Sequence, residues 1–307
     1  MAAFISLFIN LLPLYAIIAA GYFAGRVFKV DIRTMASLSI YFFLPVVIFG
    51  FVSNMAFKPL YIMLPAFIYI DSTITALSFY ALGKRIYKKD SRANLMALCS
   101  AMGNTGYFGL PLVLLFFNKD TVGIYVFMML GVSIFEATIG YYIAARGNFN
   151  VRDSLIKLLK FPSIYAIATA LIVNAMDIEL PDMFWTYWTH VKGCYVIIGM
   201  MIIGVVLGSM RTLVFDLKLT ALVFIGKFLA IPLLGGLFIW LDRAVLHMFT
   251  TDIYHLIVLI TIVPSAANVV AFSAQLNVQP EKAATTVLAG TIFALFYIPT
   301  VVWLIGM

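Results

Sequence analysis

Three ionisable side chains, Asp71, Lys227 and Glu136, lie deep inside long apolar stretches of the chain. A charge at the centre of a bilayer costs roughly 2.5–3.5 kcal/mol on insertion scales, so each of these groups must face protein or water. Asp71 could take up a proton during a working cycle, or it could form a static salt bridge with Lys227. Glu136 is a second coupling carboxylate, a partner of Lys227, or a carboxyl group satisfied by neighbouring hydroxyls.

The uncharged candidates lie where two apolar stretches are interrupted. The first break, 101–111, holds three glycines, an asparagine and a proline, and the second break is 264–268. Proline removes a backbone donor, and inside a membrane the freed groups must find partners in protein or in a wet cavity. An asparagine amide donates and accepts, so it could hold a ligand or could only cap a half-helix. We expect a substrate site at Asn104, Thr105, Gly106, Pro111, Pro264, Ser265 and Asn268.

The composition is that of a membrane protein, because 64% of the 307 residues are hydrophobic and only 11% are charged. The net charge of +7 comes from basic residues in short loops, which set topology, and does not indicate nucleic-acid binding. No nucleotide-binding, catalytic or metal-ligand spacing is found, so we expect a protein that is not an enzyme and that uses no cofactor and no metal. We expect an aromatic belt at the membrane–water interface from Trp185, Tyr187, Trp188 and Trp303.

A membrane-spanning helix needs about 20 mostly apolar residues. Most of the basic loop residues come after the first, third, fifth, seventh and ninth of the apolar stretches given below. Basic loops favour the cytoplasmic side of a membrane, so these loops are predicted to be cytoplasmic and both termini to lie outside the cell membrane. The stretches predicted to span are 4–25, 34–54, 60–83, 93–118, 121–145, 161–177, 186–209, 217–240, 252–276 and 283–305.

The ten predicted spans form two halves, 1–145 and 161–307, joined by a basic cytoplasmic linker at 146–160. Five spans in each half mean that the halves enter the membrane in opposite directions. The broken stretch is the fourth of each half, and the two breaks align on Asn104 and Asn268. Paired broken helices in inverted repeats are typical of secondary transporters, whose binding site lies where the breaks meet.

Several short motifs resemble those of the auxin efflux carrier family, the prokaryotic relatives of the plant auxin carriers. Asn-Thr-Gly-Tyr-Phe-Gly-Leu-Pro at 104–111 is the most specific of them. The others are Gly-Tyr-Phe-Ala-Gly-Arg at 21–26, Tyr-Phe-Phe-Leu-Pro at 41–45, Lys-Phe-Leu-Ala-Ile-Pro at 227–232, and Pro264 with Asn268. The resemblance extends over nearly the whole chain.

The resemblance implies an all-α membrane fold of two inverted five-helix repeats with crossed broken helices. This fold is similar to that of sodium/proton antiporters and bile-acid symporters. The scaffold would come from 1–54 and 161–209 and the mobile transport domain from 60–145 and 217–307, with homodimers formed through the scaffold. Family substrates include auxin, malate and malonate.

We therefore expect a secondary transporter that moves a small organic anion, such as a carboxylate or an auxin-like acid, by elevator-type alternating access. A proton, sodium or the membrane potential would provide the coupling. The alternative is a monovalent cation/proton antiporter of the same fold class. The broken segments carry asparagines and no acidic residue, which favours the organic solute.

Overall fold

The structure is a computed structural model that describes residues 2–144, 162–209, 214–275 and 278–306. Within these residues every regular element is helical, and one isolated β-bridge joins Gly103 to Ser265. The expected linker at 146–160 lies outside the described residues. In chain order the elements are α1 (Ala2–Val27), α2 (Ile32–Leu38), η1 (Ser39–Phe43), α3 (Leu44–Ser53), η2 (Pro59–Ile62), α4 (Met63–Tyr87), α5 (Arg92–Ala101), η3 (Thr105–Gly109), α6 (Leu110–Phe116), α7 (Lys119–Phe135), η4 (Glu136–Gly140), α8 (Tyr141–Ala144), α10 (Pro162–Ala175), α11 (Asp182–Ser209), α12 (Leu217–Ile225), η5 (Gly226–Ala230), α13 (Ile231–Leu241), η6 (Asp242–Leu246), α14 (Thr251–Ile262), α15 (Asn268–Gln275) and α16 (Pro280–Leu304).

The helices coincide with the stretches that the sequence predicts to span, and the two predicted breaks are present. The fourth stretch is interrupted between Ala101 and Thr105, and the ninth between Ile262 and Asn268. Within the described residues, five helices are long and apolar enough to cross a membrane: Pro59–Tyr87, Lys119–Ala144, Asp182–Val206, Leu217–Leu246 and Pro280–Leu304.

Short π-helical turns interrupt several of these helices. Three of them, η1, η3 and η5, are each followed by a leucine or isoleucine and then a proline: Pro45, Pro111 and Pro232. Proline cannot donate to the carbonyl four residues earlier, and its ring clashes with that carbonyl. A π-turn widens the helix at this point, so the chain continues as a helix through the proline.

The contacts divide the chain into two compact units. Unit 1 comprises Met1–Tyr61, Gly106–Phe127 and Leu159–Met210, and unit 2 comprises Ile62–Thr105, Met128–Leu158 and Arg211–Met307. Each half of the sequence contributes to both units. The chain passes from unit 2 to unit 1 within the first broken segment, between Thr105 and Gly106.

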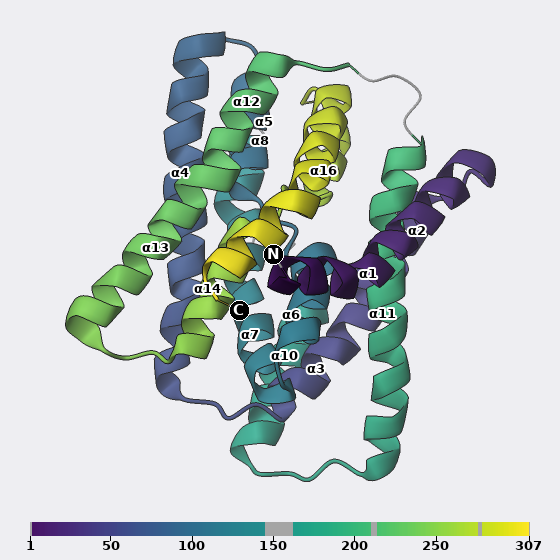
Figure 1. The fold of residues 1–307 in the computed structure, drawn as a ribbon, viewed down its shortest axis with the longest axis vertical. Coiled ribbons are helices and arrows are strands. Elements are labelled where there is room, and N and C mark those ends of the chain that lie inside the picture. Colours follow the sequence, from purple (N-terminus) through teal and green to yellow (C-terminus); the bar gives the residue numbers. More distant parts are fainter. Residues whose placement is uncertain (1, 145–161, 210–213, 276–277, 307) are drawn as a thin grey trace. The chain divides into compact units, whose positions relative to one another are not determined.

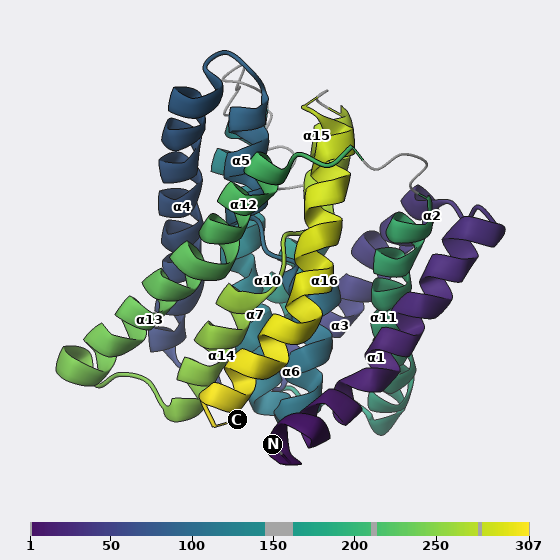
Figure 2. The same cartoon turned by 45° about the horizontal axis from the view of Figure 1, so that its top comes forward.

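Unit 1 is built around the close packing of α1 along α11, which lie side by side in Figures 1 and 2. A Cβ atom on Gly204 would collide with the carbonyl of Ile18 on α1. The reverse holds for Gly25, where a Cβ would lie 2.6 Å from the carbonyl oxygen of Val205 on α11. Gly21 and Gly208 make contacts of the same kind. Small residues allow helix backbones to approach closely, which is the main source of helix association in a membrane.

The prediction of Trp188 as an aromatic-belt residue is wrong. Its side chain is 1% exposed and its indole N–H donates to the carbonyl oxygen of Val46 at 3.1 Å. Gly50 makes room for the ring, because a Cβ there would overlap the indole. A tryptophan whose N–H finds a partner can be buried completely, and Trp188 is a core residue of unit 1.

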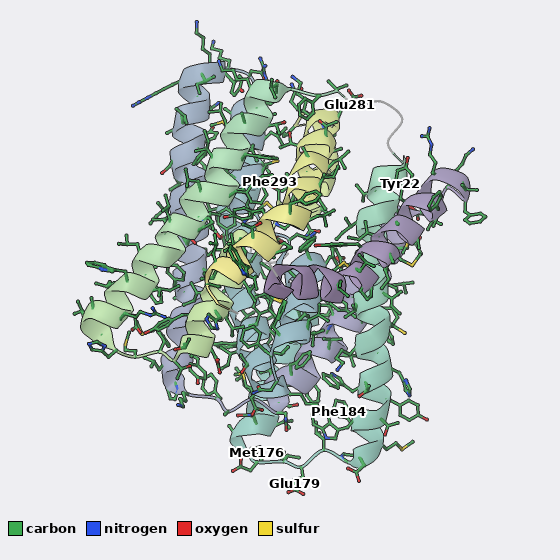
Figure 3. All side chains as sticks on the ribbon, viewed as in Figure 1. Tyr22, Met176, Glu179, Phe184, Glu281 and Phe293 are labelled. Carbon is green, nitrogen blue, oxygen red and sulfur yellow. The ribbon has the colours of Figure 1, made fainter. Side chains whose placement is uncertain are left out.

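Unit 2 is centred on α5, which is buried at every residue from Ala93 to Ala101. Helix α4 runs upward in Figure 1 while α12 and α13 run downward, so the third span of each half has the opposite direction. Beside them, Phe293 on α16 packs against Phe224 and Phe228, with ring centroids 5.2 and 4.8 Å away. Figure 3 labels Phe293 midway along α16 and Glu281 at the start of that helix.

Candidate functional site

The two broken segments of unit 2 cross each other as short extended segments. Helix α5 begins at the upper end of the unit in Figures 1 and 2, and α14 begins at the lower end. The backbone N–H of Asn104 donates to the Pro264 carbonyl oxygen at 2.8 Å, and that of Ala266 donates to the Met102 carbonyl oxygen at 2.9 Å. Gly103 and Ser265 face each other in this antiparallel bridge. The crossing therefore satisfies backbone groups that both half-helices leave open.

The residues around the crossing explain why the helices stop there. The residue before a proline disfavours the helical conformation, and Val263 has φ −62° and ψ 149°. The Ser265 hydroxyl donates to the carbonyl oxygen of Cys99 at 2.7 Å, which satisfies a carbonyl of the last turn of α5. Ser265 is 1% exposed, Asn104 4% and Thr105 5%. The crossing is thus a buried polar cluster without a charged residue of its own.

Asp71 on α4 and Lys227 on η5 line one small cavity beside the crossing. Its volume is about 10 Å³, and Ser72, Gly103, Thr105 and Thr261 also line it. Asp71 is 3% exposed and Lys227 1%. One carboxylate oxygen of Asp71, Oδ1, has no hydrogen-bond partner, and the ion pairs among the described residues involve Arg92 and Lys282 rather than Lys227. A polar cavity of this size holds about one water molecule.

Lys227 reaches the crossing because Gly103 has no side chain. A Cβ atom on Gly103 would lie 2.9 Å from the Lys227 Nζ atom and 3.0 Å from Cγ2 of Val263. The ammonium group therefore lies against the extended segment that follows α5. A cation is favoured near the C-terminal end of a helix, where the backbone carbonyls are unpaired.

Glu136 and Asn268 come from two further elements of the same unit and contact each other. Asn268 is the first residue of α15, and its side-chain Nδ2 donates to Oε2 of Glu136 at 3.4 Å. Glu136 is the first residue of the π-turn η4. The sequence left open whether Glu136 pairs with Lys227. In the structure the Glu136 carboxylate accepts a hydrogen bond from the Asn268 amide instead.

Not all the expected site residues share this unit. Gly106 and Pro111 belong to unit 1, where Pro111 is buried near the start of α6. Between them, Tyr107 packs on α11 of the same unit, with its ring centroid 6.3 Å from that of Tyr195. The first predicted motif is therefore divided: Asn104 and Thr105 take part in the crossing, and the residues from Gly106 onward pack in unit 1.

The π-turns are the feature that sequence reasoning missed. Thr105, Glu136 and Lys227 all lie in such turns, which are frequent at functional sites because they re-aim side chains and expose backbone groups. The proline two residues after η3 and after η5 was a readable signal for two of them. Nothing comparable follows η4, which ends at Gly140.

A charged network at one end of unit 2 ties its loops together. Arg92 donates through Nη1 to Asp216 Oδ2 at 3.1 Å and through Nε to Asp90 Oδ2 at 2.9 Å, and Lys282 Nζ lies 3.4 Å from Asp216. Partial burial opposes ionisation of Asp216. The backbone N–H of Leu219 and the cations Arg92 and Lys282 outweigh it, and together they lower its pKa below the ordinary value. Asp216 also caps α12 through that N–H bond.

Comparison with known proteins finds similarity to membrane transport proteins. The family model described as Membrane transport protein matches residues 6–152, which include Asp71, the first break and Glu136. A protein named an uncharacterized transporter, from Methanocaldococcus jannaschii, is 25% identical over 227 residues, covering 70% of this chain and 73% of that protein. The chain is therefore similar to membrane transport proteins, and the match to the family model is confined to its first half.

This similarity, together with the five long apolar helices among the described residues, supports a multi-pass membrane protein with a transport function. Lys227 and the second break at 263–267 lie beyond the residues that the family model matches. Their contribution to the site is seen in the structure, where they meet Gly103 and Met102 of the matched part.

Proposed function

We propose that the protein is a secondary transporter that moves a small organic anion across the cell membrane. The observation that carries this proposal is the crossing of two broken segments, which brings the buried Asn104 close to Ser265 and to the start of α15. The N-terminal end of a half-helix and uncharged amides suit a carboxylate, which accepts hydrogen bonds from both. The transported solute would be a carboxylate or an auxin-like acid.

The wider architecture follows from the same proposal. Two inverted five-helix repeats are supported by the opposite directions of α4 and α12–α13 in Figure 1. In an elevator mechanism, a transport domain built from 60–145 and 217–307 would shift against a scaffold built from 1–54 and 161–209. The protein would act as a homodimer in the cytoplasmic membrane, with both termini outside.

Coupling would reside in the cavity that Asp71 shares with Lys227. The two charges lie close to the crossing, so a change in the protonation of Asp71 alters the electrostatic field at the bound solute. A water in the cavity could bridge the unpaired Asp71 oxygen to the ammonium and carry the proton. Sodium is the other candidate for the coupling ion.

A specific observation favours the alternative, a monovalent cation/proton antiporter. The cavity of about 10 Å³ has room for a water or a small cation, but not for an organic acid. A buried carboxylate with an open coordination position is the chemistry that a small cation needs. In this alternative Lys227 would be displaced or neutral when the cation is bound.

A thermal-shift screen separates the two functions. The purified chain would be heated with malonate, malate or indole-3-acetate, each with and without sodium and lithium. A ligand at about 100 times its Kd stabilises the native state by about 2.7 kcal/mol, so a genuine substrate raises the melting temperature measurably. We expect stabilisation by a carboxylate that is lost in Asn104→Ala, because the buried amide is removed from the crossing.

Asn54→Ala is the matched control, since Asn54 is exposed at the end of α3 in unit 1. Its chain should respond to the carboxylate as the wild type does. Stabilisation by sodium or lithium alone, with no response to any organic acid, would replace the proposed function with the antiporter. Flux of the labelled ligand in proteoliposomes then distinguishes transport from binding.

A further inference from the structure

The amide of Asn268 already holds a carboxylate from the protein itself. Its Nδ2 atom donates to Oε2 of Glu136 at 3.4 Å, and the two residues come from η4 and α15, which are 132 positions apart in the chain. Asn268 begins α15, directly after the second broken segment, and the proposed function places the carboxylate of the solute close to the start of that helix. Glu136 therefore accepts the hydrogen bond from the Asn268 amide that a transported anion would accept.

Among the described residues, the amide of Asn268 donates a hydrogen bond to the Glu136 side chain. The ion pairs among the described residues do not include Glu136. Helix α4, which packs against η4, carries Asp71 in the neighbouring cavity, and its basic residues Lys84 and Arg85 lie in the last turn, at the far end. The short helices α8 and α15 carry no charged residue in their sequences.

Two carboxylates that share one donor without an ion pair to either of them are not both stable as anions, because like charges at close range favour the binding of a proton by one of them. When the solute carboxylate arrives, Glu136 must become neutral or leave the amide. A neutral carboxylic acid no longer repels the anion, and its O–H can donate to it.

We propose that Glu136 is a built-in competitor for the solute carboxylate, so that anion binding at Asn268 requires the uptake of one proton by Glu136. The proposal rests on the proposed function of organic-anion transport. The balance is simple: one proton from solution adds to a carboxylate oxygen of Glu136, its contact with Nδ2 opens, and the anion takes that contact. The anion is thereby carried together with a proton, and the charge of the proton offsets that of the anion during transport through the membrane.

The test is anion binding by the purified full-length chain as a function of pH, with malonate and indole-3-acetate as probes. For wild type, one linked proton makes the apparent Kd rise about tenfold per pH unit once Glu136 is ionised in the free protein. In Glu136→Gln the competing charge is absent while an amide oxygen still accepts from Asn268. Binding should then be tight at high pH and nearly independent of pH.

Two further variants identify the proton site. Asp71→Asn tests the other buried carboxylate, which lies in the cavity with Lys227: if this variant loses the pH dependence of binding and Glu136→Gln keeps it, the linked proton belongs to Asp71. Glu281→Gln is the matched control, since Glu281 is an exposed glutamate in the first turn of α16 (Figure 3). It should behave as the wild type at every pH.

The outcomes are distinct. If the wild type binds a carboxylate with a pH-independent Kd, or if Asp71→Asn rather than Glu136→Gln removes the pH dependence, Glu136 is not the competitor and organic-anion transport still stands. If neither the wild type nor Glu136→Gln binds any carboxylate at any pH, both proposals are overturned. The wild-type pH profile decides by itself in the event that Glu136→Gln does not fold.

Discussion

Different kinds of contact hold together the inside of unit 1 and the inside of unit 2. In unit 1, α1 and α11 approach through glycines, and backbone meets backbone. In unit 2 the central crossing buries Asn104, Ser265, Asp71 and Lys227. Close apolar packing stabilises a membrane protein, whereas buried polar and charged groups cost stability and are retained where they have a function. Under the proposed function, unit 2 would provide the chemistry and unit 1 the rigidity.

The largest effect is expected from Gly204→Leu in unit 1. The added side chain would strike the Ile18 carbonyl, and its Cβ would lie 2.6 Å from the backbone nitrogen of Tyr22, so α1 must move away from α11. We expect a loss of about 3 kcal/mol or more in unfolding free energy, or no folded protein. Thermal unfolding in detergent measures it.

Gly193→Leu is the control within the same helix, since no atom lies within 4 Å of a Cβ built at Gly193. That chain should be as stable as the wild type, or slightly more stable because leucine is a better helix former than glycine. Equal melting temperatures for the two variants would show that the α1–α11 backbone contact does not hold unit 1 together.

A smaller effect on stability and a larger one on transport are expected from Gly103→Ala in unit 2. The new methyl group would displace the Lys227 ammonium, which lies 2.9 Å from its position, and the flexible lysine can move at low cost. We expect a nearly unchanged melting temperature and a flux reduced by about tenfold or more, because misplacing a functional group by about 1 Å is costly.

Gly236→Ala on α13 is its control, because the space around a Cβ there is open. Flux in proteoliposomes, compared at equal protein content, measures both variants. A Gly103→Ala chain that transports as well as Gly236→Ala would mean that the position of Lys227 at the crossing is not needed for function.

The smallest effect is expected from Asp216→Asn at the loop end of unit 2. Asparagine still caps α12, so the change isolates the charge that pairs with Arg92 and Lys282. Because the pKa of Asp216 is lowered in the folded state, its contribution to stability is fully present above the ordinary carboxyl pKa of 3.8 and is lost as the pH falls through the folded-state pKa. We expect the variant to lose about 1 kcal/mol of stability at pH 7, and the difference from wild type to vanish at low pH. A difference that stays constant down to pH 3 would contradict this origin.

The amino-acid sequence by itself determined which segments are helical, where two of them break and which charges are buried. These features are local, because an apolar run of sufficient length and a proline next to glycine or asparagine restrict the backbone wherever they occur. The two breaks at 102–104 and 263–267 and the burial of Asp71 and Lys227 were therefore predictable. The π-turns were partly predictable, from the prolines that follow η1, η3 and η5.

Only the tertiary structure decided which partners these residues have. It joined Ser265 to the last turn of α5, brought Glu136 to Asn268, placed Lys227 over Gly103 and buried Trp188 in a core instead of at an interface. Such pairs are separated by more than a hundred positions in the chain, and many partners would satisfy the same donor equally well. The choice among them depends on how the helices pack as a whole, because packing at interior density leaves room for one arrangement, and composition and periodicity do not contain that information.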